Sequence, residues 1–205
     1  ISYTSQDARL VALDSIQISI SAVGMWINAY NSLANSFTHG NKFDEVNFIK
    51  SLGSGVNNCQ PEDIMFTHLR LGFITLVHFK IDNLFHNILK HLKLLPTRLG
   101  YWNLTDKILE TCSISKTGPE KERLTAFAYL RNSLHNNGIH RGDSLQLTIN
   151  GTVFDFIKDC RVECASWNHI IILLEYNIDI IRQFLLSSIV TNIRTEIKDD
   201  FASGN

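Results

Sequence analysis

Apolar residues recur at alternating spacings of three and four in four stretches of the chain, which is the pattern of helices with one buried stripe. The stretches cover about residues 5–37, 61–95, 119–135 and 161–198. Pro61 and Pro119 suit first helical turns, because a proline there gives up no intrahelical hydrogen bond. We therefore predict four long helices, with stripes that include Leu13, Ile16, Ile20, Leu69, Phe73, Val77, Leu124, Phe127, Leu130, Ile171, Leu174 and Ile178.

The connections between these stretches contain shorter elements. Residues 38–60 form a long connection, and within it 43–52 has the spacing of one short helix that Gly53 and Gly55 end. A second short segment covers residues 105–112, with Leu104, Ile108 and Leu109 as its apolar residues. The polar residues between it and Pro119 predict a loop.

Between the third and fourth stretches the spacing of apolar residues changes to every second position. Apolar and polar residues alternate from 144 to 149, Asn150-Gly151 follows, and a second run continues to 157. An Asn-Gly pair between such runs favours a tight hairpin turn, because both central residues need positive φ. We predict strands at about 144–149 and 152–157.

Striped helices of this length pack most economically against one another. The predicted fold class is therefore all-α, an antiparallel four-helix bundle of long helices with a β-hairpin inserted before the last helix. A chain of 205 residues fits one domain, 1–205. No Gly-rich phosphate loop and no nucleophile elbow occurs in the sequence, which sets aside P-loop, Rossmann and α/β-hydrolase enzymes.

The composition of the chain bears on which classes of partner it can bind, and it adds nothing to the fold prediction. Hydrophobic residues make up 44% of the chain, charged residues make up 19%, and the formal net charge is −1. These are values of a globular protein, and they provide no overall attraction to nucleic acid or to an anionic membrane. Any contact with RNA must then be local.

Metal and disulfide chemistry are not expected. The cysteines form no Cys-x-x-Cys pair, and Cys160 and Cys164, one helical turn apart, read as small buried side chains. The histidines of the second stretch lack the helical spacing of a metal site and read as surface residues: His68, His78, His86 and His91. We expect no metal and no cofactor.

The prediction of cellular location rests on the absence of secretion and membrane-span signals in this sequence. The chain does not start with a basic and then apolar leader, and it has no uncharged apolar run of about 18 residues. The nearest candidate for a membrane span, 167–190, contains several charged residues. We expect a cytoplasmic protein without a membrane contact.

The densest group of chemically capable side chains lies at the end of the third stretch, in residues 131–140. Arg131 and His135 are one helical turn apart, so both point to one place beside the apolar stripe. Asn136 and Gly138 signal the helix end. An arginine and a histidine together can hold a phosphate and move a proton without a metal. The structural alternative is that both cations cap the last carbonyl groups of the helix.

The Arg131-Asn132 pair, followed by His135 and an Asn-Asn-Gly exit, resembles the signature of HEPN (higher eukaryotes and prokaryotes nucleotide-binding) domains. The resemblance implies a helical bundle that dimerises so that two motifs face one cleft. Many members are metal-independent ribonucleases, and others are inactive scaffolds. The gap from Arg131 to His135 is shorter than in the usual motif, and the gap to His140 is longer.

Two functions from different classes follow. The first is a HEPN-like metal-independent endoribonuclease of the toxin or defence type, with Arg131 and His135 catalytic and with the substrate-binding residues Asn132, Asn136, His140 and Arg141. Its partners are RNA, a second copy of the chain and a cognate partner protein. The alternative is a non-catalytic dimeric helical interaction module. The polar motif favours the first function, and the near-zero net charge favours the second.

Overall fold

The computed structural model describes residues 4–37, 61–95, 97 and 99–199, with the backbone alone for 30–37 and 61–66. The predicted connection at 38–60 and its short helix at 43–52 lie outside the described residues. The elements are α1 (Ala8–Phe37), α3 (Pro61–His91), α4 (Tyr101–Thr111), α5 (Pro119–His135), β1 (Leu145–Ile149), β2 (Thr152–Phe156), α6 (Trp167–Leu186) and α7 (Ser188–Thr191).

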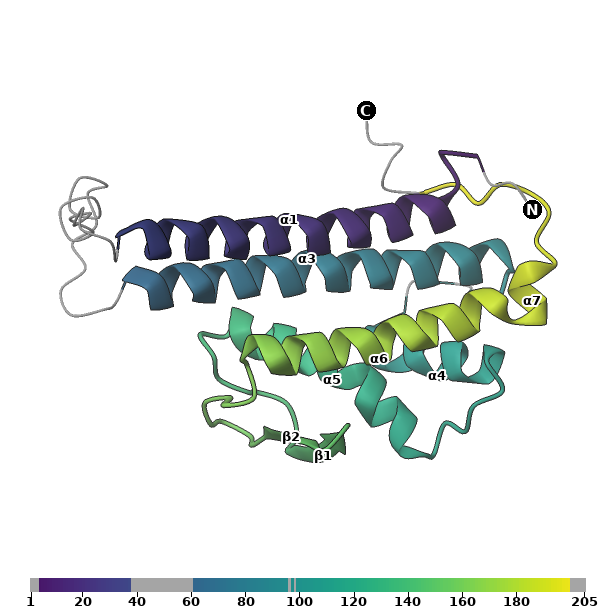
Figure 1. Cartoon of the computed structure of the whole chain (residues 1–205). Coiled ribbons are helices and arrows are strands. Elements are labelled where there is room, and N and C mark those ends of the chain that lie inside the picture. Colours follow the sequence, from purple (N-terminus) through teal and green to yellow (C-terminus); the bar gives the residue numbers. More distant parts are fainter. Residues whose placement is uncertain (1–3, 38–60, 96, 98, 200–205) are drawn as a thin grey trace.

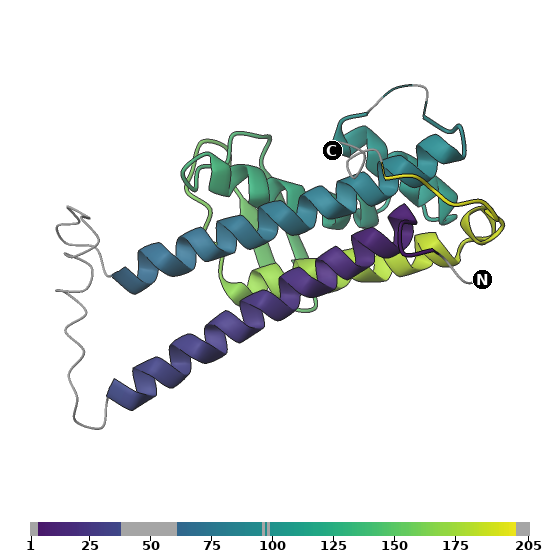
Figure 2. The same cartoon turned by 90° about the horizontal axis from the view of Figure 1, so that it is seen from above.

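The two longest helices, α1 and α3, run antiparallel beside each other (Figure 1). Figure 2 shows that they diverge toward the ends that precede and follow the connection at 38–60. Burial follows this divergence: Ala8, Ala12 and Ile16 in the first half of α1 are buried, whereas Met25 and Trp26 are exposed. Within residues 8–29, whose side chains the structure describes, the apolar stripe of α1 is therefore covered mainly in its first half.

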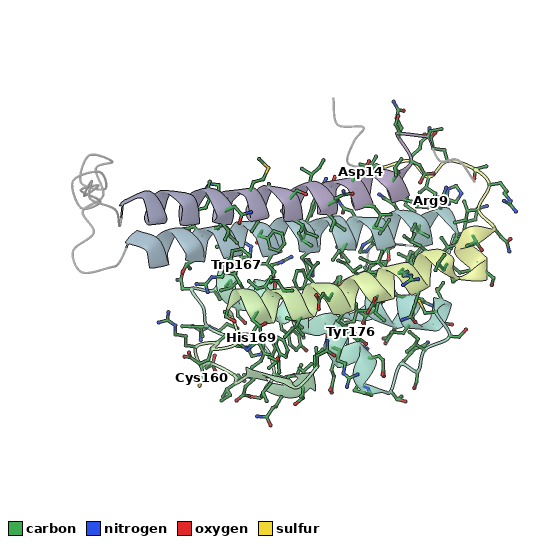
Figure 3. All side chains as sticks on the ribbon, in the orientation of Figure 1. Arg9, Asp14, Cys160, Trp167, His169 and Tyr176 are labelled. Carbon is green, nitrogen blue, oxygen red and sulfur yellow. The ribbon has the colours of Figure 1, made fainter. Side chains whose placement is uncertain are left out.

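Helix α3 is the central element, because it contacts α1, α4, α5 and α6. Its residues from Ile81 to Leu89 are almost all buried, and Phe85 meets Phe184 of α6 edge to face, with ring centroids 5.2 Å apart. Helix α6 aims Trp167 at Phe73 of α3 (Figure 3). A helix covered on several sides needs apolar residues around most of its circumference.

The β-hairpin prediction is confirmed. Strands β1 and β2 pair antiparallel, with Leu147 opposite Phe154 and Ile149 opposite Thr152. Asn150 and Gly151 have φ values of 49° and 76°, as a tight hairpin turn requires. The hairpin buries Phe154 and Phe156 against the helices.

The last predicted helix, 161–198, is wrong at both ends. Its first residues are held in an antiparallel contact with the segment after α5, in which the Val162 N–H donates to the Gly138 carbonyl at 2.8 Å. Ser166 then caps α6. At the other end the extended backbone of Ser187 separates α6 from α7.

The chain after α7 returns to the start of α1. The Ala8 N–H donates to the Ile197 carbonyl at 2.8 Å, and the Ile197 N–H donates to Asp7 at 3.2 Å. Asp7 also forms a buried ion pair with Arg9 at 2.7 Å. Arg9 lies near α7 in Figure 3. This contact joins the two ends of the described chain.

The prediction of an all-α fold with one hairpin before the last long helix is confirmed. The prediction of surface histidines is wrong for His78 and His86, which are buried because α3 is central. Cys164 is buried as expected, but Cys160 is exposed and lies outside any helix. Among the described residues no group of histidines, cysteines and acids is arranged to hold a metal ion.

Helix α1 includes one stretch, Ala8–Ala29, that is long and apolar enough to cross a membrane, with a mean hydropathy of 1.6 and only 17% buried. The sequence pattern pointed to 167–190 instead. Length and composition are shared by membrane spans and by helices that a partner covers. The absence of a membrane contact therefore stays a prediction.

Candidate functional site

All six residues predicted for the site line one hollow of about 480 Å³ at the end of α5. We term it the cationic hollow, because its charged lining residues are arginines and none is acidic. Its lining consists of Tyr129, Arg131, Asn132, His135, Asn136, His140, Arg141 and Gly142.

The end of α5 shapes this hollow. The helix stops at His135, as predicted, and the Gly138 N–H donates back to the Ser133 carbonyl at 2.9 Å. Asn137 and Gly138 have φ values of 56° and 81°, so two successive left-handed residues turn the chain sharply. The turn folds the following segment back beside the last turn of α5.

Arg131 lines the hollow with a guanidinium that is only partly engaged. Its Nη1 donates to Oδ1 of the neighbouring Asn132 at 2.7 Å, and its buried Nε has no hydrogen-bond partner among the described residues. In the part of the chain that the structure describes, no carboxylate pairs with this guanidinium. A half-buried cation with unused donors is suited to bind an anion.

His135 is exposed, and α3 orients its ring. Its Nε2 lies 3.0 Å from Oγ1 of Thr75, a hydroxyl that can accept the Nε2 hydrogen. Nδ1 has no hydrogen-bond partner within the described residues. His135 can therefore present Nδ1 as a proton acceptor while Thr75 fixes the ring.

His140 lies in the wall of the hollow and is buried. Its Nδ1 is 3.2 Å from Oγ of Ser133, and its Nε2 is 2.9 Å from the carbonyl oxygen of Asp143, so Nε2 carries a hydrogen and donates it. Its ring also contacts those of Tyr129 and Phe156, each with centroids 5.4 Å away. With both nitrogens engaged, His140 positions the loop that follows it. Ser133 is itself buried.

The remaining predicted residues are exposed at the rim of the hollow. Asn132 and Asn136 present their amides to solvent, apart from the Asn132 contact with Arg131. Arg141 forms an ion pair with Asp159 at 2.8 Å, in which both side chains are largely exposed. An exposed pair of this kind is weak and can open for a stronger anion.

His78, which the sequence did not suggest for the site, lies buried in the interior near Arg131. Its ring stacks on Phe127 and contacts Tyr101, with centroids 6.2 Å and 4.5 Å away. In the described part of the chain neither ring nitrogen has a hydrogen-bond partner. Burial, assisted by the positive charge of Arg131, lowers the pKa of His78 to about 4. His78 is therefore neutral at neutral pH.

Thr75, His78 and Tyr129 have no sequence signal that marks them, because each is an ordinary helix residue until the packing of α3 on α5 is known. Comparison of the chain with protein-family models, with curated proteins and with solved structures finds no match.

Proposed function

We propose that this chain is a HEPN-like, metal-independent endoribonuclease whose reaction takes place in the cationic hollow. The observation that carries the proposal is the state of Arg131, a half-buried guanidinium without a carboxylate partner in the described chain, one helical turn from His135. A partly buried cation without an internal partner destabilises the folded protein, and a bound phosphate would offset this loss by pairing with the charge.

The two catalytic residues have separate roles. Arg131 binds the scissile phosphate and neutralises the charge that develops on its oxygens. His135 accepts the proton of the ribose 2′-hydroxyl through Nδ1, and the 2′-oxygen attacks phosphorus. The bond from phosphorus to the 5′-oxygen breaks, that oxygen takes a proton from water as it leaves, and the resulting hydroxide takes the proton from His135, which restores the histidine. The products are a 2′,3′-cyclic phosphate and a 5′-hydroxyl.

The other residues bind substrate or support the hollow. Asn132 and Asn136 supply amides to the sugar-phosphate chain, and Arg141 supplies a second cation when it leaves Asp159. His140 holds the wall. In the assembly that we propose, α1, α3, α5 and α6 are the members of an antiparallel four-helix bundle, and two copies of the chain form a homodimer.

Cleavage of a single-stranded RNA in excess chelator tests this function. We expect the parent to release fragments with cyclic phosphate ends. Arg131→Ala and His135→Ala should each slow cleavage by about a hundredfold or more. Arg182→Ala and His68→Ala replace exposed residues of the same types elsewhere and should leave the rate unchanged. A parent without activity, or site variants as active as the parent, would exclude the proposed chemistry.

A non-catalytic dimeric interaction module is the second candidate, and one observation favours it. Helix α1 exposes large apolar side chains, with Ile18 67% and Met25 73% exposed. Exposed apolar surface of this kind marks interaction sites. The module and the enzyme differ in whether the cationic hollow cleaves RNA.

A further inference from the structure

A second hollow, of about 470 Å³, shares Tyr129 with the cationic hollow. It is lined by Trp102, Glu122, Tyr129, Asp143, Ser144 and Leu145. We term it the acidic hollow, because its only charged lining residues, in the part of the chain that the structure describes, are carboxylates. Two hollows of opposite charge therefore share one aromatic residue in their walls.

The walls of the acidic hollow include two parallel aromatic rings. The planes of Trp102 from α4 and Tyr129 from α5 are within 1° of parallel, and their centroids are 6.3 Å apart. Phe156 supports the Tyr129 ring edge to face at 5.8 Å, and Lys121 lies 4.2 Å from the centroid of the Trp102 ring. Trp102 is exposed, Tyr129 is half-buried, and Lys121 lies over the Trp102 ring, so the accessible parts of the two rings form the aromatic wall of the hollow. Aromatic walls of this kind are platforms for the planar bases of single-stranded nucleic acid.

The two carboxylates determine which base suits this hollow. Glu122 and Asp143 line the same hollow as Tyr129, one from helix α5 and the other from the segment before β1. Burial raises the pKa of the Tyr129 phenol, and the charges of the two carboxylates raise it further. Asp143 lies 3.9 Å from Lys158 in a contact in which both side chains are exposed, so this pair is weak. Ionised carboxylates only accept hydrogen bonds. They match guanine, whose N1–H and N2–H donors lie side by side, better than uracil, which offers N3–H alone.

We propose that the acidic hollow binds the base of the nucleotide beside the phosphate held in the cationic hollow, and that it selects guanine. The inference rests on the proposed function for the position of the phosphate. A nucleotide has the same division of charge, with an anionic phosphate and a base edge that donates hydrogen bonds. The carboxylates repel phosphate, so the nucleotide can bind in one orientation only.

His140 links the two hollows. Its Nε2 donates to the Asp143 carbonyl, which fixes the backbone of one carboxylate, and its ring packs against Tyr129. His140 therefore supports both the proposed base site and the proposed phosphate site.

Binding of short 2′-O-methyl RNAs tests the inference without cleavage, because these RNAs lack the attacking hydroxyl. Two probes differ only in one central residue, guanine or uracil. We expect the parent to prefer the guanine probe. Trp102→Ala should weaken its binding by about tenfold or more, given the usual contribution of base stacking. Trp102→Phe should retain most of the affinity.

Charge variants and a matched control complete the experiment. Glu122→Gln combined with Asp143→Asn should remove the preference for guanine, whereas Arg131→Ala should weaken both probes equally. Ile171→Ala is the control, since Ile171 on α6 is 48% exposed against 44% for Trp102, and it should bind like the parent.

The outcomes separate this inference from the proposed function. Equal binding of the two probes, or full guanine binding by Trp102→Ala, overturns the base site even if the protein cleaves RNA. A guanine preference that depends on Trp102, in a protein that leaves unmodified RNA intact, supports the base site and excludes the catalytic role.

Discussion

At the scale of single residues, the buried histidine of α3 shows how the interior bears on the site. The His78 ring contacts those of Tyr101 and Phe127, and no described residue forms a hydrogen bond with either of its nitrogens. Protonation would place a second charge close to Arg131, whose positive charge already opposes it. The neutral ring thus leaves Arg131 as the only cation of this pair.

This arrangement predicts a loss of stability in acid. Since the folded pKa is about 4 and the ordinary value is 6.5, the unfolded chain takes up a proton below pH 6.5 that the folded chain does not. The free energy of unfolding should fall by about 2 kcal/mol between pH 7 and pH 5 on this account. Urea unfolding of His78→Leu should lack this part of the decrease, and His68→Leu should keep it. Parallel pH profiles for His78→Leu and the parent would contradict the prediction.

The parts of the site that could be predicted from the sequence are those that depend on local helix geometry. Arg131 and His135 share a helix face, and the Asn137-Gly138 turn ends that helix, so their meeting in one hollow needs no knowledge of the tertiary fold. Thr75 and His78 could not be predicted, because their roles depend on which side of α3 meets α5. The engagement of both His140 nitrogens likewise depends on contacts outside the helix.

At the scale of elements, the observed helix boundaries differ from the predicted ones where segments distant in the sequence pair with each other. The hairpin was predictable because the turn chemistry of Asn150-Gly151 is local. The start of α6 was not, because residues 160–162 pair with the segment after Gly138 instead of continuing the helical pattern. A similar long-range contact holds the start of α1.

The ion pair between Asp7 and Arg9 should stabilise the contact between the start of α1 and the segment after α7. Asp7 accepts hydrogen bonds from the Arg9 side chain and from the N–H groups of Arg9 and Ile197. Burial alone would raise the Asp7 pKa, but these bonds outweigh it and lower the pKa below 3.8. Its contribution is therefore present above pH 3.8 and is lost as the carboxyl protonates below it.

Asp7→Asn leaves the Arg9 charge buried without this partner and should reduce the free energy of unfolding at pH 7 by about 3 kcal/mol. Chemical denaturation measures this change. Asp14→Asn, an exposed position on the same helix labelled in Figure 3, should change stability by less than about 0.5 kcal/mol. Equal stabilities of the two variants would show that the pair does not hold the ends together.

At the scale of the whole molecule, the distribution of apolar surface indicates how copies of the chain associate. The large exposed apolar residues of the described part of α1 include Ile18 and Met25, and α5 has none among its residues. Figure 1 shows α1 on the side of the molecule opposite the hairpin, which follows the cationic hollow in the chain. Dimers bury such faces, because the burial of apolar area supplies most of the association energy.

We therefore expect a homodimer that forms through α1 and leaves the cationic hollow open to RNA. Light scattering at micromolar concentration should give twice the mass of one chain for the parent and the mass of one chain for Ile18→Glu combined with Met25→Glu. Ile171→Glu, at an isoleucine of α6 that is 48% exposed, should remain a dimer. A monomeric parent would exclude the dimer. A dimer that survives both α1 substitutions would place the contact on another face, and the pairing of two motifs in one cleft that HEPN domains use would then be the arrangement to test.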